Sequence, residues 1–360
     1  MDVVIGVDAH KKTHTLVAVD KAGRRLAQKT IATTSAAHGE GARWARSRFG
    51  TNLIWAVEDC RTLTARLERD LLAEGLDVVR VPPHLMSRTR ASSREQGKSD
   101  PIDALAVARA VLREPHLPVA SHDPVSMELR LLVDRREDLV GQRTATINRL
   151  LSRVHYLDPE QPVPANWNVK SARDEIQAWL ATQEGLVAEL AGDEAADIAR
   201  FSDDIAKLGR QITQRVRAVA PTLLAVKGCG ELSAAKIVAE VADIRRFRSE
   251  AAFANYIGLA PIPHSSGETN VRIRKGRHGN RQLNMAVHRI AVTQIHHEGP
   301  GKDYFQRRLA EGNDRHHALR SLKRRLARVV FNRLRADQSR ARADTQDQSI
   351  QGEHRQPTGQ

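Results

Sequence analysis

The sequence has few cysteines, few aromatic residues and no long apolar run. Its 360 residues include two cysteines and 4% aromatic residues. Cys60 and Cys229 are too few for a disulfide framework, and neither has a second cysteine at the spacing of a zinc site. No apolar run approaches the roughly 18 residues that a membrane-spanning helix requires. The opening segment MDVVIGVDAHKK lacks the basic start of a signal peptide. These absences predict a cytoplasmic protein with no disulfide scaffold and no membrane span.

Positive charge is what the sequence has in excess. Lysine and arginine number 57 against 43 aspartate and glutamate, which gives a formal charge of +14. Such a surplus favours a polyanionic partner, and nucleic acid is the first candidate. An anionic membrane surface is the second, but it usually requires aromatic anchors or a lipidation signal. We therefore expect a nucleic-acid partner and no membrane partner.

The first hundred residues alternate strand-like and helix-like patterns. β-Branched and alternating runs predict strands at residues 3–7, 13–19, 24–33, 53–57 and 77–81. Helical spacing predicts helices at residues 36–48 and 63–73, and a third helix that begins at Asp100. The resulting order, β-β-β-α-β-α-β-α, predicts a mixed sheet with helices packed on it. It is the element order of the RNase H-like nuclease and integrase fold, one of several folds compatible with it.

Four acidic residues follow these elements in a pattern that suggests a metal site. Asp8 ends the first predicted strand, Glu58 ends the fourth, and Asp100 and Asp103 begin the helix in GKSDPIDALAVARAV. The first and fourth strands of an RNase H-like sheet are neighbours, and helical residues three apart share one face. Converging carboxylates require cations, and hard oxygen ligands favour Mg²⁺ or Mn²⁺. The pattern therefore predicts two-metal phosphoryl-transfer chemistry.

Each of these acidic residues also has a simpler interpretation. Asp100 could be a helix N-cap, and Asp103 could stabilise the helix dipole. Asp8 could be a turn residue at a strand end, and Asp59 competes with Glu58 for the inward position. The joint placement of the acidic residues, on the expected elements and in the expected order, favours the metal site.

The histidines are not predicted to bind metal. The spacing of His10 and His14 suits zinc on a helix, but on a strand the two residues would lie roughly 13 Å apart. The histidine pairs at residues 296–297 and 316–317 are interpreted as solvated or phosphate-facing.

Two long charged helices are predicted in the middle of the chain. One spans residues 127–155, with Leu132, Leu139 and Leu150 roughly on one stripe, and the other spans residues 184–219. The proline-rich break PEQPVPANW separates them. Two such helices predict an antiparallel hairpin or a coiled coil, although polar interruptions weaken a strict heptad. We interpret this part as an arm or an oligomerisation element.

The C-terminal third is basic and mostly helical. LLAVKGCGELSAAKIVAEVAD predicts a helix-hairpin-helix whose glycines let backbone N–H groups approach phosphate, and a plain helical turn is the alternative. Residues 316–335 place leucine and valine on one helical face and arginine over most of the rest. The candidate phosphate-binding residues are Lys227, Gly228, Gly230, Arg272, Arg274, Lys275, Arg277, Arg281, Arg320, Lys323 and Arg324. The polar tail at residues 336–360 is predicted to be disordered.

Several motifs together resemble the DEDD transposases of the IS110 insertion-sequence family, relatives of the Piv invertases that include bridge-RNA-guided recombinases. The matching stretches are IGVDAHK, AVED, KSDPIDALAVA, REDLVGQRTATINRL, VKGCGELSAAKIVAEVAD and FANYIGLAPIPHSSGETNVRIRKGRHGNRQL. They occur in the correct order and cover nearly the whole chain up to about Arg335.

The resemblance implies a division of the chain and a nucleophile. It implies a RuvC-like DEDD nuclease domain at residues 1–120, a coiled-coil arm at 121–220, and a helical transposase domain at 221–335 that carries a catalytic serine. That serine directly precedes a glycine in the family, which makes it Ser266 here, with the adjacent Ser265 as the alternative. A serine hydroxyl requires a base or a metal ion to activate it, and His264 or carboxylate-bound Mg²⁺ would serve.

The resemblance also implies partners and a reaction. Family members act as tetramers on donor and target DNA with a structured guide RNA, and they exchange strands through a Holliday-type junction. By this resemblance Ser266 attacks a DNA phosphate, with Mg²⁺ held by the carboxylates of a partner subunit. The leading hypothesis is a site-specific DNA recombinase. The alternatives are a RuvC-like junction nuclease with a structural serine, and a non-catalytic nucleic-acid-binding protein.

Overall fold

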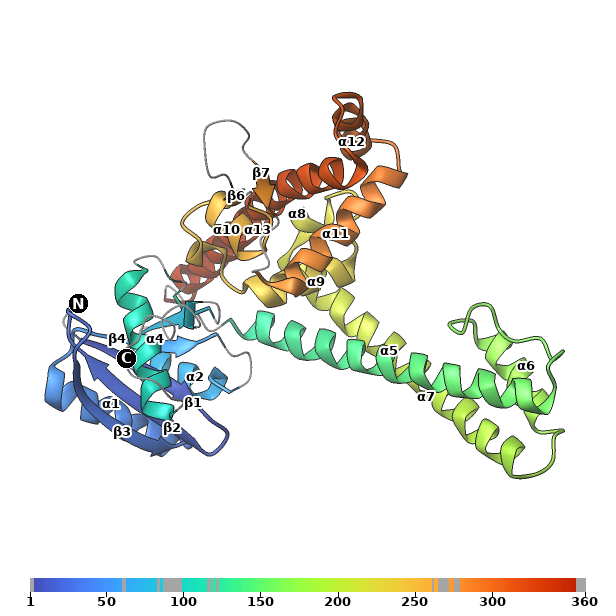
Figure 1. Cartoon of the computed structure of the whole chain (residues 1–360), viewed down its shortest axis with the longest axis horizontal. Helices are drawn as coiled ribbons and strands as arrows, with labels where there is room; N and C mark the ends of the chain where they lie inside the picture. The colour runs from blue at the N-terminus through green and yellow to red at the C-terminus, as the bar shows by residue number, and fades with distance from the viewer. Residues whose placement is uncertain are drawn as a thin grey trace, which may run out of the picture. The chain divides into compact units, whose positions relative to one another are not determined.

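A computed structural model gives the arrangement of the chain (Figure 1). It describes residues 3–59, 63–82, 85–86, 99–114, 117, 119–120, 123–260, 262–264, 272–274 and 279–353, with side chains described outside 262–264, 272–274 and 344–353. The chain divides into two compact units. The first contains the residues up to Asp123 together with Asp243–Tyr256, and the second contains Pro124–Ala242 and most of the chain from Ile257 onward.

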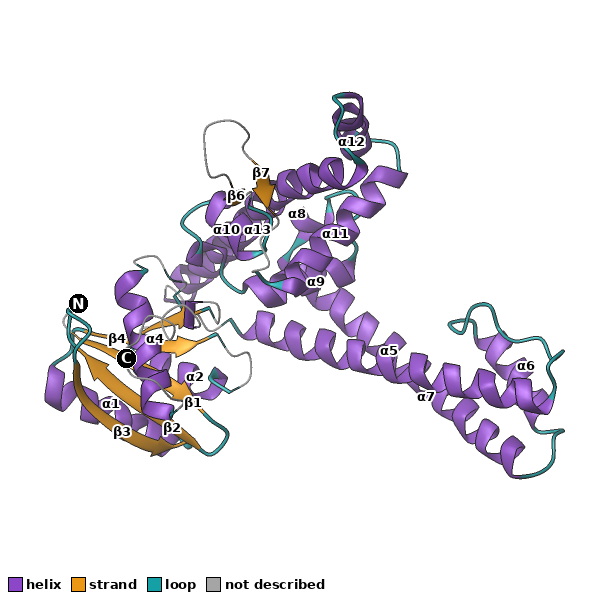
Figure 2. Ribbon diagram, in the orientation of Figure 1, coloured by secondary structure: helices purple, strands orange, loops and turns teal. Residues whose placement is uncertain are grey.

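The first unit is built on a five-stranded mixed sheet (Figure 2). Its strands are β1 (Val3–Ala9), β2 (Thr13–Val19), β3 (Arg25–Ala32), β4 (Leu53–Glu58) and β5 (Asp77–Val81). They lie in the order β3-β2-β1-β4-β5, with β1, β2 and β3 antiparallel and β1, β4 and β5 parallel. This is the strand order of an RNase H-like sheet, so the predicted fold is confirmed.

Helices cover both faces of this sheet. Val3, Ile5 and Val7 of β1 belong to an apolar cluster with residues of α1 (Ser35–Phe49) and α2 (Ala65–Ala73). Val4 belongs instead to a cluster with α4 (Asp100–Arg113) on the other face. Successive side chains of a strand point to opposite faces, so each strand position can be assigned to the α1–α2 face or the α4 face.

The second unit begins with two long helices that pack antiparallel, α5 (Pro124–Leu157) and α7 (Leu186–Val219). Arg215 of α7 pairs with Glu128 near the start of α5, whereas Arg153 near the end of α5 pairs with Glu194 of α7. Only antiparallel helices allow both pairs. Figure 1 shows the two helices side by side. The predicted antiparallel hairpin is therefore observed.

A helix that the sequence patterns do not assign, α6 (Lys170–Leu180), lies between α5 and α7 in sequence. Its Ile176 and Leu180 are buried with Leu150 of α5 and Ile198 of α7 in one apolar cluster. The buried positions of α6 are four residues apart, which is the helical spacing. The apolar cluster thus joins α6 to the ends of α5 and α7 that adjoin it.

The rest of the second unit is mostly helical. It contains α8 (Pro221–Leu224), α9 (Glu231–Val241), α11 (Arg281–His296), α12 (Pro300–Ala310), α13 (Arg315–Glu353) and a short strand pair, β6 (Ile262–His264) and β7 (Arg272–Arg274). Between these elements, η1 (Ile244–Arg246) and α10 (Glu250–Tyr256) belong to the first unit. Among the described residues no helix is long and apolar enough to cross a membrane.

The tail predicted to be disordered from residue 336 is helical as far as Glu353, as part of α13. Asp337 is only 3% exposed, and its carboxylate accepts hydrogen bonds from the backbone N–H groups of Thr222 and Leu223. It therefore caps α8, where helix N–H groups lack internal partners. The prediction was wrong for this part of the tail because a polar residue acquired a buried structural role.

Candidate active site

The ends of two parallel strands place acidic residues on the same face of the sheet. β1 and β4 pair in register from Val3 with Leu53 to Val7 with Val57, so Asp8 and Glu58 are the next residues of neighbouring strands. Gly6 lies against α4, and alternation puts Asp8 on that face as well. Ala56 belongs to the α4 cluster, so the same argument puts Glu58 on the α4 face.

Asp59 does not share this position. It lies just beyond the end of β4, where its backbone N–H donates to the carbonyl oxygen of Val81. Its carboxylate accepts from the hydroxyl of Tyr256 at 3.4 Å. The pleat of β4 thus favours Glu58 over Asp59 for the face that carries Asp8.

The start of α4 brings two more carboxylates to this face. A Cβ atom on Gly6 would lie 2.1 Å from the carbonyl oxygen of Ala104 and 2.8 Å from the Cβ of Ala108, so the missing side chain allows α4 to pack directly on β1. Ser99 occupies the extended N-cap position, which makes Asp100 the first helical residue rather than the N-cap. Asp103 follows one turn later and is 7% exposed.

His10 joins these carboxylates. The Nε2 atom of His10 lies 3.0 Å from Oδ2 of Asp8 and 3.3 Å from Oδ1 of Asp100. A turn after β1 positions His10, whose backbone N–H donates to the carbonyl oxygen of Thr13. The sequence patterns missed His10 because they compared it only with His14. The sequence did contain a signal, because His10 and His14 both adjoin the turn that follows the strand carrying Asp8.

The electrostatics of the cluster favour positive charge. Burial raises the pKa of the Asp8 carboxyl, His10 opposes that rise, and Asp103 and Asp100 add to it. The negative charge of Asp8 raises the pKa of the His10 imidazole, and Asp100 contributes to the same rise. Burial of Asp8 and the nearby negative charges thus make this a place where a bound proton or cation is stabilised.

The chemistry of the donors fits a divalent metal ion. One ligand atom from each of Asp8, His10 and Asp100 can be chosen so that all lie within 4.8 Å of one another. Two carboxylates and an imidazole are ligands that divalent cations accept, and the carboxylates suit hard cations in particular. Asp103 and Glu58 lie on the same face, but this group of ligand atoms does not include them, so their part in a metal site stays a prediction.

His14 has a different environment from His10. It is 1% exposed, on the α1–α2 face, with its ring stacked 5.3 Å from the ring of His38. Nδ1 of His38 lies 2.7 Å from Oδ2 of Asp70. Burial lowers the pKa of His14 to about 4, and the neighbouring His38 and His10 contribute to the decrease. His10 and His14 therefore lie in different environments, in agreement with the argument against a zinc site made of the two.

The proposed nucleophile lies outside the described residues. β6 and β7 are antiparallel, with His264 opposite Arg272, and Ser265 and Ser266 belong to the connection between the two strands. Lys275 and Arg277 are also outside the described residues. Arg272 and Arg274 are placed by their backbone in β7. The roles of these residues stay predictions.

The remaining basic candidates lie on described helices and turns of the second unit. Arg281 begins α11, while Arg320, Lys323 and Arg324 lie on α13. Nζ of Lys323 donates to Oδ1 of Asn284 at 2.7 Å. Lys227 precedes the glycine turn before α9, and its ammonium donates to the carbonyl oxygen of Glu298. These cations are distributed over several elements rather than gathered around one ligand.

The two glycines of the predicted helix-hairpin-helix differ. Gly228 has a φ of +81°, and a Cβ atom there would lie 2.9 Å from Cβ of Thr293 in α11. Gly230 is the N-cap of α9, and a Cβ atom there would meet nothing within 4 Å. Gly228 is therefore required for backbone conformation and packing, while only Gly230 leaves open space at a helix N-terminus.

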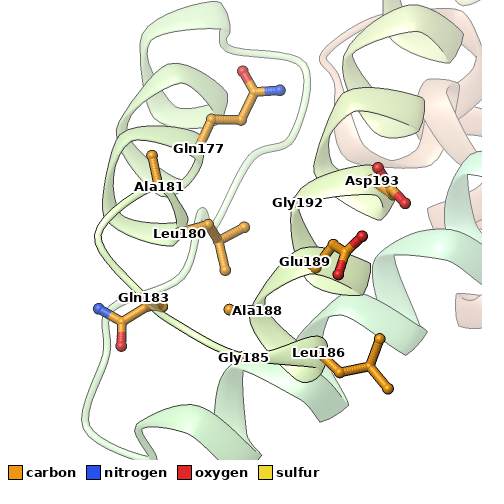
Figure 3. Close-up of a pocket in the computed structure, with 10 residues that line it drawn as sticks. All are labelled: Gln177, Leu180, Ala181, Gln183, Gly185, Leu186, Ala188, Glu189, Gly192 and Asp193. Carbon is orange, nitrogen blue, oxygen red and sulfur yellow. The ribbon is translucent and has the colours of Figure 1, made fainter.

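A hollow of about 580 Å³ lies between α6 and the start of α7 (Figure 3). Glu189 and Asp193 contribute carboxylates to it, whereas none of the described residues that line it is a lysine or an arginine. A site lined in this way repels phosphate. It is therefore not a candidate for the nucleic-acid contact that the composition predicts.

Comparisons with known proteins give a consistent result. Residues 5–158 match a DEDD transposase family model of the IS110 type, described as "Transposase". Residues 220–306 match a second model, described as "Transposase IS116/IS110/IS902 family". The two matches include the acidic residues of the sheet unit and the serine segment respectively.

Individual relatives extend over almost the entire chain. The insertion element IS116 uncharacterized 44.8 kDa protein of Streptomyces clavuligerus is 26% identical over 92% of this chain and 94% of its own. The insertion element IS900 uncharacterized 42 kDa protein of Mycobacterium paratuberculosis is 25% identical over 92% of this chain and 95% of its own. Among solved structures, T. thermophilus RuvC in complex with Holliday junction substrate matches 33% of this chain and 100% of that chain, at 17% identity and a TM-score of 0.26.

Proposed function

The chain belongs to the IS110 family of transposases, and from this membership we propose that it cuts and exchanges DNA strands with a serine nucleophile and a carboxylate-bound metal site. The observation that carries the proposal is the cluster of Asp8, His10 and Asp100, with Glu58 and Asp103 on the same face of an RNase H-like sheet. Its substrate would be DNA, consistent with the positive charge of the chain.

The residues that would hold the divalent metal are Asp8, Glu58, Asp100 and Asp103. Such an ion, when bound, stabilises the negative charge that develops on oxygen during phosphoryl transfer. We propose Mg²⁺ ahead of Mn²⁺ because these four ligands offer only hard oxygen atoms. The nearby imidazole of His10 makes Mn²⁺ a workable substitute.

The serine segment would supply the attacking group. The Oγ atom of Ser266, or of Ser265, forms a bond to the DNA phosphorus, and the bond from phosphorus to the leaving deoxyribose oxygen breaks. The serine proton is transferred to a base, and the leaving oxygen takes up a proton. His264 adjoins the serines in sequence and is one candidate base. The product is a covalent protein–DNA ester that a second strand can attack.

The basic residues of the second unit would hold the phosphate backbone. Arg281, Arg320 and Arg324, together with the basic residues around β7, would each neutralise phosphate charge without reading sequence. A structured guide RNA and a tetramer belong to the proposal because the family resemblance implies them. In that arrangement the serine of one subunit would act with the carboxylates of another.

A recombination assay tests the proposal. The chain is supplied with its element ends, Mg²⁺ and co-expressed RNA from the flanking DNA, and the products are compared for wild type, Ser266→Ala, Ser265→Ala and Asp100→Asn. We expect Asp100→Asn and one of the two serine variants to abolish recombination. Full activity in Asp100→Asn together with both serine variants would exclude the mechanism.

A RuvC-like junction nuclease is the second candidate, because the carboxylate cluster alone suffices for metal-assisted hydrolysis. A suicide substrate distinguishes the two functions. A recombinase leaves a protein–DNA adduct that migrates slowly on a denaturing gel, and the adduct is lost in the serine variant. A nuclease releases cleaved DNA with no adduct, and its activity survives the replacement of both serines.

A further inference from the structure

A second hollow, of about 500 Å³, lies in the second unit at the start of α12, and we call it the Tyr304 pocket. Its walls come from the turn before α9, the end of α11, the first turns of α12 and the middle of α13. It is as large as the sites that bind small organic ligands. None of the functions assigned above uses it, apart from the predicted phosphate contact of Lys227.

Cations surround the Tyr304 pocket. The guanidinium of Arg325 lies 4.6 Å from the centre of the Tyr304 ring, and that of Arg307 lies 5.2 Å from it. Lys227 lines the pocket as well, and its ammonium is held by the backbone carbonyl of Glu298. Asp303 is the acidic residue of the lining. Two guanidinium groups and an ammonium make an environment that attracts a phosphate.

The inner surface of the pocket is apolar. Val226, Leu322 and Leu326 are buried there, and Val329 is 37% exposed. An apolar surface beside guanidinium groups and a tyrosine ring suits the flat face of a nucleobase. A bare phosphate would use only the cationic part of the pocket, whereas a nucleotide would use both parts.

The rim of the pocket is fixed by close packing. The side-chain amide of Gln294 donates to the carbonyl oxygen of Lys227 at 2.8 Å. A Cβ atom on Gly301 would lie 2.2 Å from Oε1 of Gln294, so the glycine leaves space for this amide. The backbone that carries Lys227 is thereby tied to the end of α11. The cation is attached to a supported backbone rather than to a free loop.

The hollow between α6 and the start of α7 provides a contrast (Figure 3). The two hollows have similar volumes, but Glu189 and Asp193 give that one the opposite charge. Of the two, only the Tyr304 pocket combines cations, an aromatic ring and apolar side chains. Its chemistry, rather than its size, indicates the class of ligand.

We propose that the Tyr304 pocket binds one unstacked nucleotide of a single nucleic-acid strand. The phosphate lies against Arg307, Arg325 and Lys227, and the base covers Leu326 and Val329. This inference rests on the proposed function, which requires strands to be separated for exchange and so supplies unpaired nucleotides. The pocket holds one such nucleotide away from its neighbours and thereby fixes the register of the strand.

Binding of single strands tests the inference. Fluorescence anisotropy is measured for labelled single-stranded DNA and RNA of about 12 nucleotides, with the full-length chain at several salt concentrations. Arg307→Gln combined with Arg325→Gln is expected to weaken binding by about tenfold and to reduce the salt slope by about 0.7 for each phosphate that is no longer neutralised. Val329→Trp fills the pocket without changing the charge, and we expect affinity to fall about tenfold with an unchanged salt slope.

A matched variant controls for net charge. Arg210→Gln combined with Arg335→Gln removes two exposed cations from α7 and α13 outside the pocket lining, and we expect it to weaken binding much less than the pocket variant does. If the pocket variants lose affinity for only one of the two labelled strands, that strand, DNA or RNA, is the one that the pocket binds. Equal losses of affinity in both double variants, with wild-type binding by Val329→Trp on both strands, would overturn the inference.

The outcome is separable from the proposed function. If the inference fails, Val329→Trp recombines and binds like wild type while Asp100→Asn stays inactive. If the proposed function fails, recombination is insensitive to Asp100→Asn, yet the binding difference between Val329→Trp and wild type still reports on the pocket.

Discussion

The sheet unit and the basic helices of the second unit use charge in opposite ways. In the sheet unit, strand alternation and one helix start direct a few carboxylates to one place, where burial and then the charges of Asp103 and Asp100 raise the pKa of Asp8. In the second unit, the cations are spread over α11, α13 and the turn before α9. The first arrangement concentrates function in single residues and the second divides it among many. Single substitutions should therefore have large effects in the carboxylate cluster and small ones among these distributed cations.

The largest effect is expected at the carboxylate cluster. Asp8→Asn removes a negative charge that lies close to those of Asp100 and Asp103 and that a bound metal ion requires. DNA strand cleavage should therefore fall by about 10³-fold or more. DNA binding should not weaken, because a negative charge has been removed. Glu40→Gln, at an exposed position on α1, is the control of equal charge change and should cleave normally. Cleavage at the wild-type rate by Asp8→Asn would remove the cluster from the mechanism.

The next effect concerns the packing that builds the cluster. Gly6→Ala places a methyl group 2.1 Å from the carbonyl oxygen of Ala104, so α4 must move away from β1. We expect a decrease of about 3 kcal/mol in the free energy of unfolding and a loss of cleavage, because α4 carries Asp100 and Asp103. Gly141→Ala is the control, since a Cβ atom there meets nothing within 4 Å. On the exposed face of α5 it should stabilise by up to about 1 kcal/mol.

The buried histidine of the sheet unit should make stability depend on pH. The pKa of His14 is about 4 in the folded chain and about 6.5 when it is exposed. Between these values the unfolded chain binds a proton that the folded chain does not, so stability falls as pH falls from 6.5 to 4, by up to about 3 kcal/mol. Urea unfolding at several pH values measures this slope.

His14→Phe is the variant that isolates the effect, because a phenyl ring can still stack on His38 but does not titrate. Its stability should decline less steeply than that of wild type between pH 6.5 and pH 4. Titrating groups that do not interact with His14 contribute equally to both proteins, so the difference between the two slopes belongs to His14 and its neighbours His38 and His10. Identical slopes would show that His14 does not titrate differently in the two states.

Much of this unit could be predicted from the sequence. The strand order, the start of α4 and the placement of Asp8, Glu58, Asp100 and Asp103 follow from local periodicity combined with strand alternation. The place of His10 beside the turn after β1 was a signal in the sequence, but its contact with Asp8 and Asp100 depends on how that turn returns over the sheet.

The second unit was less predictable, because long-range contacts determine it. Asp337 is polar and lies in a polar tail, yet it caps a helix more than 100 residues earlier in the chain. Val329 shares the apolar face of its helix with buried leucines, yet it is 37% exposed and lines the Tyr304 pocket. The predicted arm and transposase domain fall into one compact unit, and Asp243–Tyr256 groups with the sheet. No local pattern encodes these partners.

The glycine turn before α9 should respond unequally at its two glycines. Gly228→Ala imposes a left-handed φ on a residue with a side chain and brings its Cβ atom to 2.9 Å from that of Thr293, so we expect stability to fall by about 2 kcal/mol. Gly230→Ala has space, and its φ of −73° suits any residue, so its stability should change by less than about 1 kcal/mol. Thermal unfolding of the two variants measures the difference, and equal decreases would contradict the packing argument.

The smallest effect is expected for a single cation of the second unit. Arg320→Gln on α13 removes one of several distributed charges, so DNA affinity should fall by a few fold and the salt slope by about 0.9 if the side chain contacts one phosphate of a duplex. The decrease should be the same for every DNA sequence, because a phosphate contact carries no base information. Cleavage at saturating DNA should stay at the wild-type rate, in contrast to Asp8→Asn. A sequence-dependent decrease, or a large loss of cleavage at saturation, would mean that Arg320 acts at a defined site, and these cations would then concentrate function as the carboxylates of the sheet unit do.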